Sequence, residues 1–236
     1  MKKLTSYFTK FELALWFSSV AVIIASYIIF GVENYFTLAA SLAGTAMLIL
    51  NAKGNPLGQA LAIVFSIMYA VISFSYAYYG EMITYLGMTA PMAALSLVSW
   101  LRNPFKGKKS EVTVNRLGKK EIALMLILSA VVTAAFCYIL KSLSTANLEI
   151  STASITTSFI AAYLTARRSP YFGLAYASND VVLIVMWIMA ALENPSYFSV
   201  VICFVVFLFN DIYGFVNWKR MRKKQSAEMR KKQSAV

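Results

Sequence analysis

The sequence has no histidine, two cysteines and only ten acidic residues. The absence of histidine removes one common proton relay and one common catalytic group. Cys137 and Cys203 both lie within long apolar runs, so packing is expected of them rather than a disulfide or thiol chemistry. A membrane enzyme needs a metal cluster or an activated nucleophile, and the sequence offers no such set. No cofactor and no metal are therefore expected.

Charge is scarce as well, since charged residues make up 14% of the 236 residues and apolar residues 59%. The mean hydropathy is +0.65. A soluble domain of this length needs far more polar surface. Several runs approach or exceed the ~18 apolar residues that a helix needs to cross a membrane. The composition predicts an all-α polytopic membrane protein.

Eight transmembrane helices are predicted, with ends uncertain by about two to four residues. Their ranges are 13–30, 36–50, 59–79, 82–101, 121–140, 150–166, 171–192 and 197–217. The first apolar run extends to Phe30 without a convincing small-residue cleavage site, so we expect a retained helix and not a signal peptide.

Basic residues favour the cytoplasmic side of a membrane, which sets the orientation. With eight spans and a cytoplasmic N-terminus, every lysine and arginine except Lys141 falls on the inside. Four glutamates then mark the outer turns: Glu33, Glu81, Glu149 and Glu193. Both termini are predicted to be cytoplasmic.

The formal charge of +12 needs no nucleic acid, because basic segments beside membrane spans set topology or touch anionic lipid. Residues 219–236 form a basic cytoplasmic tail that contains RKKQSA twice. We expect a disordered, solvated end, with a contact to protein or lipid as the alternative. Trp16, Trp100 and Trp218 stand near the cytoplasmic boundary, where tryptophan commonly anchors a helix.

A faint internal repeat organises the spans. NAKGNPLGQALA follows the second span and TARRSPYFGLAYA follows the sixth, so both turns give basic residues, then proline, then glycine. The fourth and eighth spans end alike, in SWLR and NWKR. Since a single span connects the two units, they would run in the same direction, as parallel repeats. The alternative is chance similarity between cytoplasmic turns.

The predicted organisation has five parts. An N-terminal cytoplasmic segment and an extra helix occupy 1–35, and a first three-helix bundle occupies 36–101. A basic loop and a linker helix follow at 102–149, and a second three-helix bundle at 150–218. The basic tail ends the chain.

Polar residues interrupt the last apolar run, which reads FLFNDIYGFVNWKR at 207–220. A mid-helix aspartate facing lipid costs roughly 2.5–3.5 kcal/mol on insertion scales, so these groups should face the interior. Helical spacing places the polar residues of this span on one face, with Asp211 at its edge, and those of the seventh span on one broad face of their own; Gln59 opens the third span. The candidate substrate-binding residues are Gln59, Tyr176, Asn179, Asp180, Trp187, Asn210, Asp211, Tyr213 and Asn217. Hydrogen bonds that merely pin helices together are the alternative for the Asn-Asp pairs, and an interfacial belt for Trp187.

FNDIYGFVNWKR, the Asn-Asp pair of the seventh span and PMAALSLVSW together resemble the PnuC family of vitamin transporters from the second span onward. The resemblance implies a SWEET-like fold of two parallel three-helix bundles joined by a linker helix. It also implies facilitated diffusion of nicotinamide riboside across the bacterial inner membrane, drawn onward by cytoplasmic phosphorylation for NAD synthesis. By analogy with the fold, it implies a homo-oligomer, such as a trimer. No GxxxxGK[ST] loop is present, which argues against ATP-driven transport.

The residue types suit that substrate. A cationic pyridinium ring favours aromatic faces, by roughly 0.5–2 kcal/mol, and a carboxylate, while amide and ribose hydroxyls want Asn, Gln and Tyr. The spans contain no lysine or arginine deep in the membrane for a phosphate group. Thiamine or riboflavin remains an alternative substrate, and an intramembrane enzyme or a receptor is the alternative class.

Overall fold

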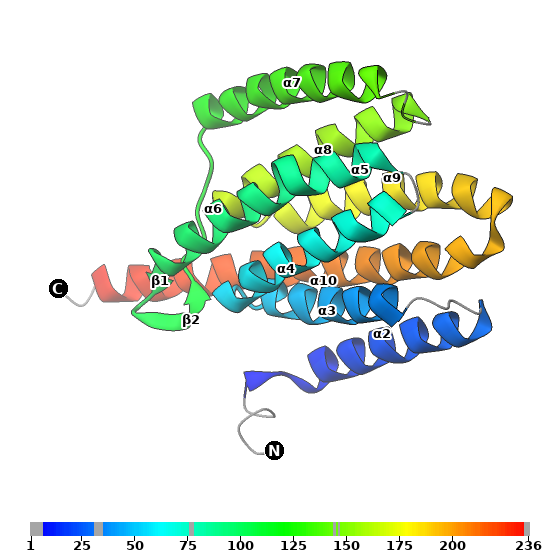
Figure 1. Ribbon diagram of the computed structural model, residues 1–236. Coiled ribbons are helices and arrows are strands. Elements are labelled where there is room, and N and C mark those ends of the chain that lie inside the picture. The colour runs from blue at the N-terminus through cyan, green and yellow to red at the C-terminus, as the bar shows by residue number, and fades with distance from the viewer. Residues whose placement is uncertain (1–6, 31–34, 76–77, 144, 146, 234–236) are drawn as a thin grey trace.

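The computed structural model describes residues 7–30, 35–75, 78–143, 145 and 147–233, and helices running side by side dominate it (Figure 1). The helices are α2 (Lys10–Ile29), α3 (Tyr35–Ala52), α4 (Pro56–Ser75), α5 (Tyr79–Thr84), α6 (Ala90–Leu101), α7 (Lys119–Ser142), α8 (Leu148–Ala166), α9 (Phe172–Glu193) and α10 (Phe198–Gln233). A π-helical turn, Tyr85–Thr89, joins α5 to α6, and a 3-10 turn, Pro195–Tyr197, precedes α10. The short antiparallel strands β1 (Pro104–Phe105) and β2 (Lys108–Val112) form a hairpin.

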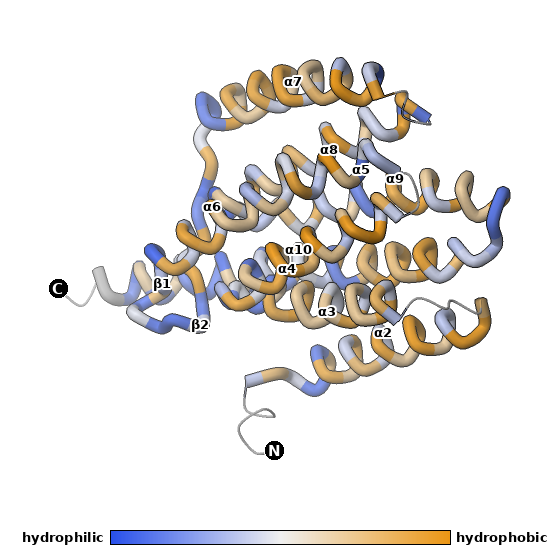
Figure 2. Tube along the Cα trace, in the orientation of Figure 1, coloured by the Kyte–Doolittle hydropathy of each residue, from blue (hydrophilic) through white to orange (hydrophobic). Residues whose placement is uncertain are grey.

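Within the described residues, seven stretches are long and apolar enough to span a membrane: α2, α3, α4, α5 with α6, α7, α9 and α10. Hydrophobic residues run along these helices, and hydrophilic residues gather at the hairpin and at the helix ends (Figure 2). The chain is a multi-pass membrane protein. The predicted span at 150–166 corresponds to α8, which has 19 residues but is the most hydroxyl-rich of the helices.

Two helices flank the bundle. α2 packs against α3 and α10, and α7 packs against α8 on the far side (Figure 1). Between them α4 packs on α3 and α6, while α9 packs on α8 and α10. α7 exposes a row of large apolar side chains, including Ile127 and Val131, which are 62% and 60% exposed. Such a surface is compatible with lipid, where apolar side chains need no cover.

The turns after α3 and α8 have the same conformation. Gly54 has a φ of 68° and Arg168 a φ of 56°, both left-handed. The linker segment binds both turns: the Val112 N–H donates to the Gly54 carbonyl and the Asn115 N–H to the Arg168 carbonyl, each at 3.0 Å. The turns are thus alike in backbone shape and in the way the linker holds them.

The tryptophans at the ends of α6 and α10 are also used alike. The Trp100 indole N–H donates to the Thr165 carbonyl at 2.9 Å, and that of Trp218 to the Asn51 carbonyl at 2.8 Å. Both side chains are fully buried, and their rings lie 5.3 Å apart. The expectation that they anchor the helices at the membrane surface is wrong, because the Trp100 indole is buried against the end of α8 and the Trp218 indole against the end of α3.

The basic end of the chain differs from the expected disordered tail, because α10 continues to Gln233. Gln225 is buried; its Nε2 donates to Glu111 Oε1 at 2.9 Å and its Oε1 accepts from the Val114 N–H at 2.9 Å. Lys106 of the hairpin forms an ion pair of 2.5 Å with Glu228. These contacts with the hairpin and the linker explain why the extension is ordered.

One expected outer-turn glutamate is misplaced. Glu81 lies in α5 and is only 2% exposed, whereas Glu149 and Glu193 are exposed near helix ends. Glu33 lies outside the described residues. Cys137 and Cys203 are free thiols, as expected.

Candidate functional site

A cavity lies near the centre of the bundle, lined by residues of α3, α4, the π-helical turn, α6, α8, α9 and α10. The space open to water molecules is about 60 Å³. Its polar walls are Asn51, Gln59, Ser66, Tyr85, Thr89, Ser158, Tyr176, Asn179, Asp180 and Asp211. None of the residues that line it, all within the described part of the chain, is a lysine or an arginine.

Two carboxyl groups face each other in this wall. Asp180 of α9 and Asp211 of α10 are 4% and 5% exposed and lie within hydrogen-bonding reach of one another. Asp180 Oδ2 is buried without a hydrogen-bond partner in the described part of the protein. When both are ionised, carboxylates buried this close repel each other, so a bound cation beside them would stabilise the charged pair.

Gly173 allows the two aspartates to meet. A Cβ atom at this position would lie 2.7 Å from the Asp211 carbonyl oxygen and 2.7 Å from the Phe215 nitrogen. Both are backbone atoms, so any larger residue would force α9 and α10 apart. Gly173 therefore lets α9 and α10 approach closely enough for Asp180 and Asp211 to line the same cavity.

Two amides are held in place around the carboxyl pair. Asn179 Oδ1 accepts hydrogen bonds from Thr157 Oγ1 at 2.8 Å and from Ser158 Oγ at 2.9 Å. On the opposite side Gln59 Nε2 donates to Asn51 Oδ1 at 2.8 Å. These bonds orient both amides and restrict their motion, so they can present fixed donors and acceptors to a polar ligand.

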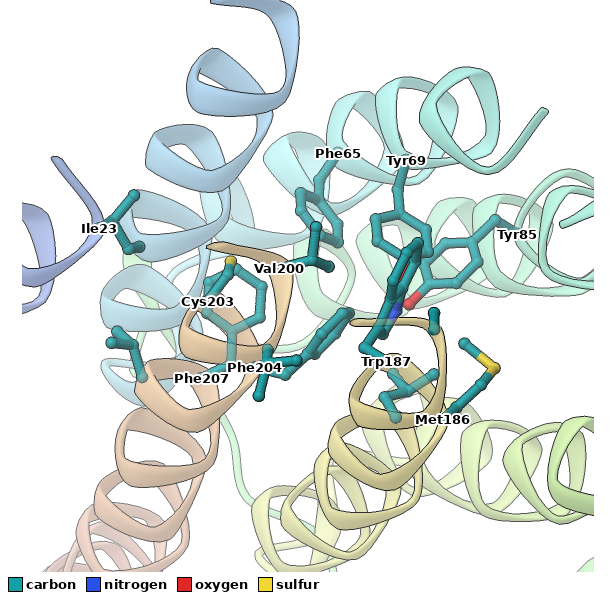
Figure 3. Packing of buried hydrophobic residues seen from close by; sticks show 14 of the residues in the cluster. Ile23, Phe65, Tyr69, Tyr85, Met186, Trp187, Val200, Cys203, Phe204 and Phe207 are labelled. Atoms are coloured by element: carbon teal, nitrogen blue, oxygen red, sulfur yellow. The ribbon is translucent and has the colours of Figure 1, made fainter. Parts of the chain in front are cut away.

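Aromatic rings complete the walls: Phe65, Tyr85, Phe172, Tyr176, Phe204 and Phe207. Phe65, Tyr69 and Tyr85 point toward Trp187 and Phe204 from facing helices (Figure 3). The rings of Tyr69 and Tyr85 are centred 4.3 Å apart. Flat π-faces beside buried carboxyl groups suit a ligand that is both aromatic and cationic. No three His, Cys, Asp or Glu side chains cluster as a metal site among the described residues.

Residues 34–220 match the family described as nicotinamide mononucleotide transporter. The chain belongs to this family. It is 22% identical over 224 residues to the nicotinamide riboside transporter PnuC of Neisseria mucosa, which covers 93% of this chain and 85% of that protein. The crystal structure of the vitamin B3 transporter PnuC superposes with a TM-score of 0.80 at 19% identity, over 92% of this chain and 94% of that one. The predicted PnuC resemblance is confirmed, and the fold is shared.

Within this family member, the structure brings five of the nine predicted site residues to one cavity: Gln59, Tyr176, Asn179, Asp180 and Asp211. They come from α4, α9 and α10. The convergence supports the prediction that the polar groups face inward. A role for them in substrate binding stays a prediction.

Two predicted residues pin the scaffold instead. Trp187 is fully buried behind the cavity wall, and its Nε1 donates to the Tyr69 hydroxyl at 2.7 Å (Figure 3). It belongs neither to the cavity nor to an interfacial belt. Asn217 Nδ2 donates to the carbonyl of Ala52, the last residue of α3, at 2.8 Å.

The other two predicted residues hold α2. Asn210 Nδ2 donates to Ser19 Oγ at 2.9 Å. The Tyr213 hydroxyl donates to Glu12 Oε1 at 2.8 Å, and Lys53 Nζ lies 3.2 Å from the other oxygen of that carboxylate. These side chains face inward, as expected, but toward the extra N-terminal helix.

Sequence reasoning missed Asn51, Tyr85, Thr89 and Ser158 as cavity residues. Tyr85 and Thr89 come from the π-helical turn, which widens a helix locally and re-aims its side chains. Nothing in the apolar run around them signals this turn. Asn51 could have been found, because it opens the repeated turn NAKGNP.

Proposed function

We propose that this protein carries nicotinamide riboside into the cell by facilitated diffusion. The observation that carries the proposal is the buried pair Asp180 and Asp211 in a cavity whose lining contains no lysine or arginine. A cationic pyridinium nucleoside would stabilise the two groups as ionised carboxylates, and their negative charge would in turn balance the positive charge of the substrate.

The rest of the substrate matches the remaining walls. The pyridinium ring can lie against the aromatic faces of Tyr85, Phe204 and Phe207, a contact worth about 0.5–2 kcal/mol. The carboxamide and the ribose hydroxyls find partners in the amides of Gln59 and Asn179. A site of this kind rejects analogues that leave its buried polar groups unpaired.

The two names among the relatives differ by one phosphate: the family is described by the mononucleotide, the Neisseria protein by the riboside. A phosphate group needs arginine, lysine or clustered N–H donors. The cavity offers two carboxyl groups in their place, and these would repel it. We therefore favour the riboside as substrate.

Passage requires the walls to move. The 60 Å³ of open space accommodates a few waters, at about 10–15 Å³ each, and a nucleoside is far larger. We propose that the two halves rock around the cavity, exposing it to either side in turn. Net uptake then follows the substrate's own gradient, maintained by cytoplasmic phosphorylation of the nucleoside.

We propose eight spans, with α8 as the sixth, in a bacterial inner membrane with both termini cytoplasmic. Two parallel three-helix units, α3–α6 and α8–α10, are joined by α7, with α2 outside them. The matched turns and the reciprocal bonds of Trp100 and Trp218 support this arrangement. We propose a homo-oligomer, a trimer by analogy with the fold.

Binding to the purified protein tests the substrate assignment. Isothermal titration with nicotinamide riboside, nicotinamide mononucleotide, thiamine and riboflavin should give the riboside the lowest Kd and the mononucleotide a much higher one. Thiamine is the strongest competitor, because it is also an aromatic cation. If thiamine or riboflavin binds tenfold tighter than the riboside, about 1.4 kcal/mol, the substrate assignment fails.

Transport itself is tested in liposomes that contain only this protein. With equal riboside inside and outside, an imposed proton or sodium gradient should cause no net accumulation. Accumulation against the riboside gradient would overturn facilitated diffusion. An encapsulated nucleoside kinase with ATP should drive continued uptake, whereas a kinase without ATP should not.

A further inference from the structure

A second cavity lies at the basic end of the bundle, between the start of α7 and the turn that leads into α9. The space open to water molecules in it is about 560 Å³. Its walls include Arg116 of the linker, Tyr171 before α9 and Arg222 of α10, beside Leu117, Ile122 and Leu164. Nothing in the transport cycle proposed above uses it.

The charges at this cavity are unbalanced. Neither Arg116 nor Arg222 forms an ion pair with a carboxylate in the described part of the chain. The neighbouring Glu121 is already bound by Arg167, and Glu111 accepts from Gln225. A site with cationic walls and no free carboxylate within it favours an anion.

Two nearby groups add to this positive character. Arg168 bonds through its carbonyl to Asn115 in the cavity wall, at 3.0 Å. Its Nε and Nη1 are buried without a hydrogen-bond partner among the described residues. Burial and then Arg167 lower the pKa of Arg168, as expected where no carboxylate compensates. Lys219 Nζ donates to the Tyr171 hydroxyl at 3.3 Å.

The apolar residues in the cavity wall favour a lipid over a free anion as the ligand. Leu117, Ile122 and Leu164 line one cavity with the two arginines, and Ile122 is 42% exposed on the outer flank of α7. The apolar surface of α7 continues from there along the helix. A hydrated phosphate ion gains nothing from such walls, whereas an amphiphile buries its apolar part against them.

We propose that this cavity binds the phosphate group of an anionic phospholipid between Arg116 and Arg222, with an acyl chain along α7. The site is independent of the central cavity, since it shares no residue with it. Its bound lipid would join the linker to α10 and so hold α7 against the rest of the bundle.

Native mass spectrometry of the delipidated, purified protein tests the proposal with three probes: phosphatidylglycerol, phosphatidylcholine and glycerol 3-phosphate. We expect phosphatidylglycerol to bind at least tenfold tighter than phosphatidylcholine. We expect no binding of glycerol 3-phosphate at concentrations that saturate the lipid site. Equal binding of both lipids would overturn the proposal. Glycerol 3-phosphate binding as tightly as the lipid would show a free-anion site and overturn it too.

A matched pair of double variants locates the site. Arg116→Gln with Arg222→Gln should lose at least tenfold in phosphatidylglycerol affinity. Lys223→Gln with Lys224→Gln removes the same charge from exposed positions of α10 and should change the affinity less than twofold. Equal losses in both would mean a diffuse charge effect and no site. If the first pair fails to fold, Arg116→Gln alone, on the exposed linker, serves in its place.

Discussion

The two proposed three-helix units of the protein share a scaffold but not a chemistry. Counted from the proline of each repeated turn, Phe65 and Ser66 of α4 occupy the places of Asn179 and Asp180 in α9, and all four line the central cavity. The backbone brings equivalent positions to one space, and only the second half supplies a carboxyl group there.

The same contrast holds at the ends of the units. Counted from the terminal tryptophan, Ala93 of α6 occupies the place of Asp211 in α10, and both line the cavity. Meanwhile Ser99 and Asn217, one residue before those tryptophans, both donate to the carbonyl of a helix's last residue, Ser99 to that of α8 and Asn217 to that of α3. Contacts that hold the halves together are thus repeated, whereas residues suited to a cation are not.

The largest expected effect breaks this asymmetry at the cavity. Asp180→Asn should raise the Kd for nicotinamide riboside by about 30-fold or more, since removing one charge that faces a bound cation costs about 2–5 kcal/mol. Ser66→Ala, at the matched position of the first half, should change the Kd less than threefold. Titration calorimetry measures both, and equal effects would mean that the halves contribute alike.

The next effect concerns the contact between α9 and α10. Gly173→Ala places a Cβ atom 2.7 Å from backbone atoms of α10, so the helices must separate. Overpacking of this kind costs about 1–3 kcal/mol, and thermal unfolding in detergent should show a lower Tm. Gly214→Ala is the control, because its Cβ atom would lie 3.8 Å from Ala52. A Tm loss in the control as large as in Gly173→Ala would contradict the close approach as its cause.

Some features of this protein could be predicted from its sequence and others could not, because some are encoded locally and others depend on contacts between distant segments. Apolar runs and turn residues are local signals, so the helices and the repeat of NAKGNP and TARRSP were accessible without a structure. The direction in which a polar side chain points within the bundle is not local. Asn210 and Asp211 are neighbours in sequence, yet Asn210 meets Ser19 of α2 and Asp211 meets the cavity.

The helix face on which a residue lies predicts that its side chain points inward, but it does not predict which neighbouring helix the side chain contacts. α2 has no counterpart in the repeat, so nothing in the repeat pattern indicated that it would take the side chains of Asn210 and Tyr213. The helical end of α10 could not be predicted either, because it depends on contacts with segments distant in the sequence. Its basic composition is typical of a solvated tail, and only the contact of Gln225 with the hairpin and linker overrides that expectation.

A smaller effect, on the free energy of unfolding, should have opposite signs at Gly54 and at Arg168, the left-handed residues of the two turns. Gly54 suits its left-handed φ, whereas Arg168 does not. Gly54→Ala should therefore lower the free energy of unfolding by about 1 kcal/mol, and Arg168→Gly should raise it by a similar amount. Chemical unfolding in detergent without added phospholipid measures both. Destabilisation by Arg168→Gly would mean that the arginine side chain contributes more than its backbone conformation costs.

The smallest expected effect on binding concerns Trp187, which has the right chemistry for a pyridinium ring and the wrong position. Its indole N–H is committed to the Tyr69 hydroxyl behind the cavity wall. Trp187→Phe should therefore change the Kd for nicotinamide riboside less than threefold, while lowering the free energy of unfolding by about 1 kcal/mol for the lost hydrogen bond and further for the space that the smaller ring leaves in the core. Tyr69→Phe removes the same bond from its other end but keeps its ring, so it should destabilise by about 1 kcal/mol and less than Trp187→Phe does. Because both variants break one interaction, the double variant should lose less than the sum of the two single losses. A tenfold loss of affinity in Trp187→Phe, with normal binding in Tyr69→Phe, would instead mean that the indole contacts the substrate. The unit that supplies the two aspartates would then supply an aromatic contact as well.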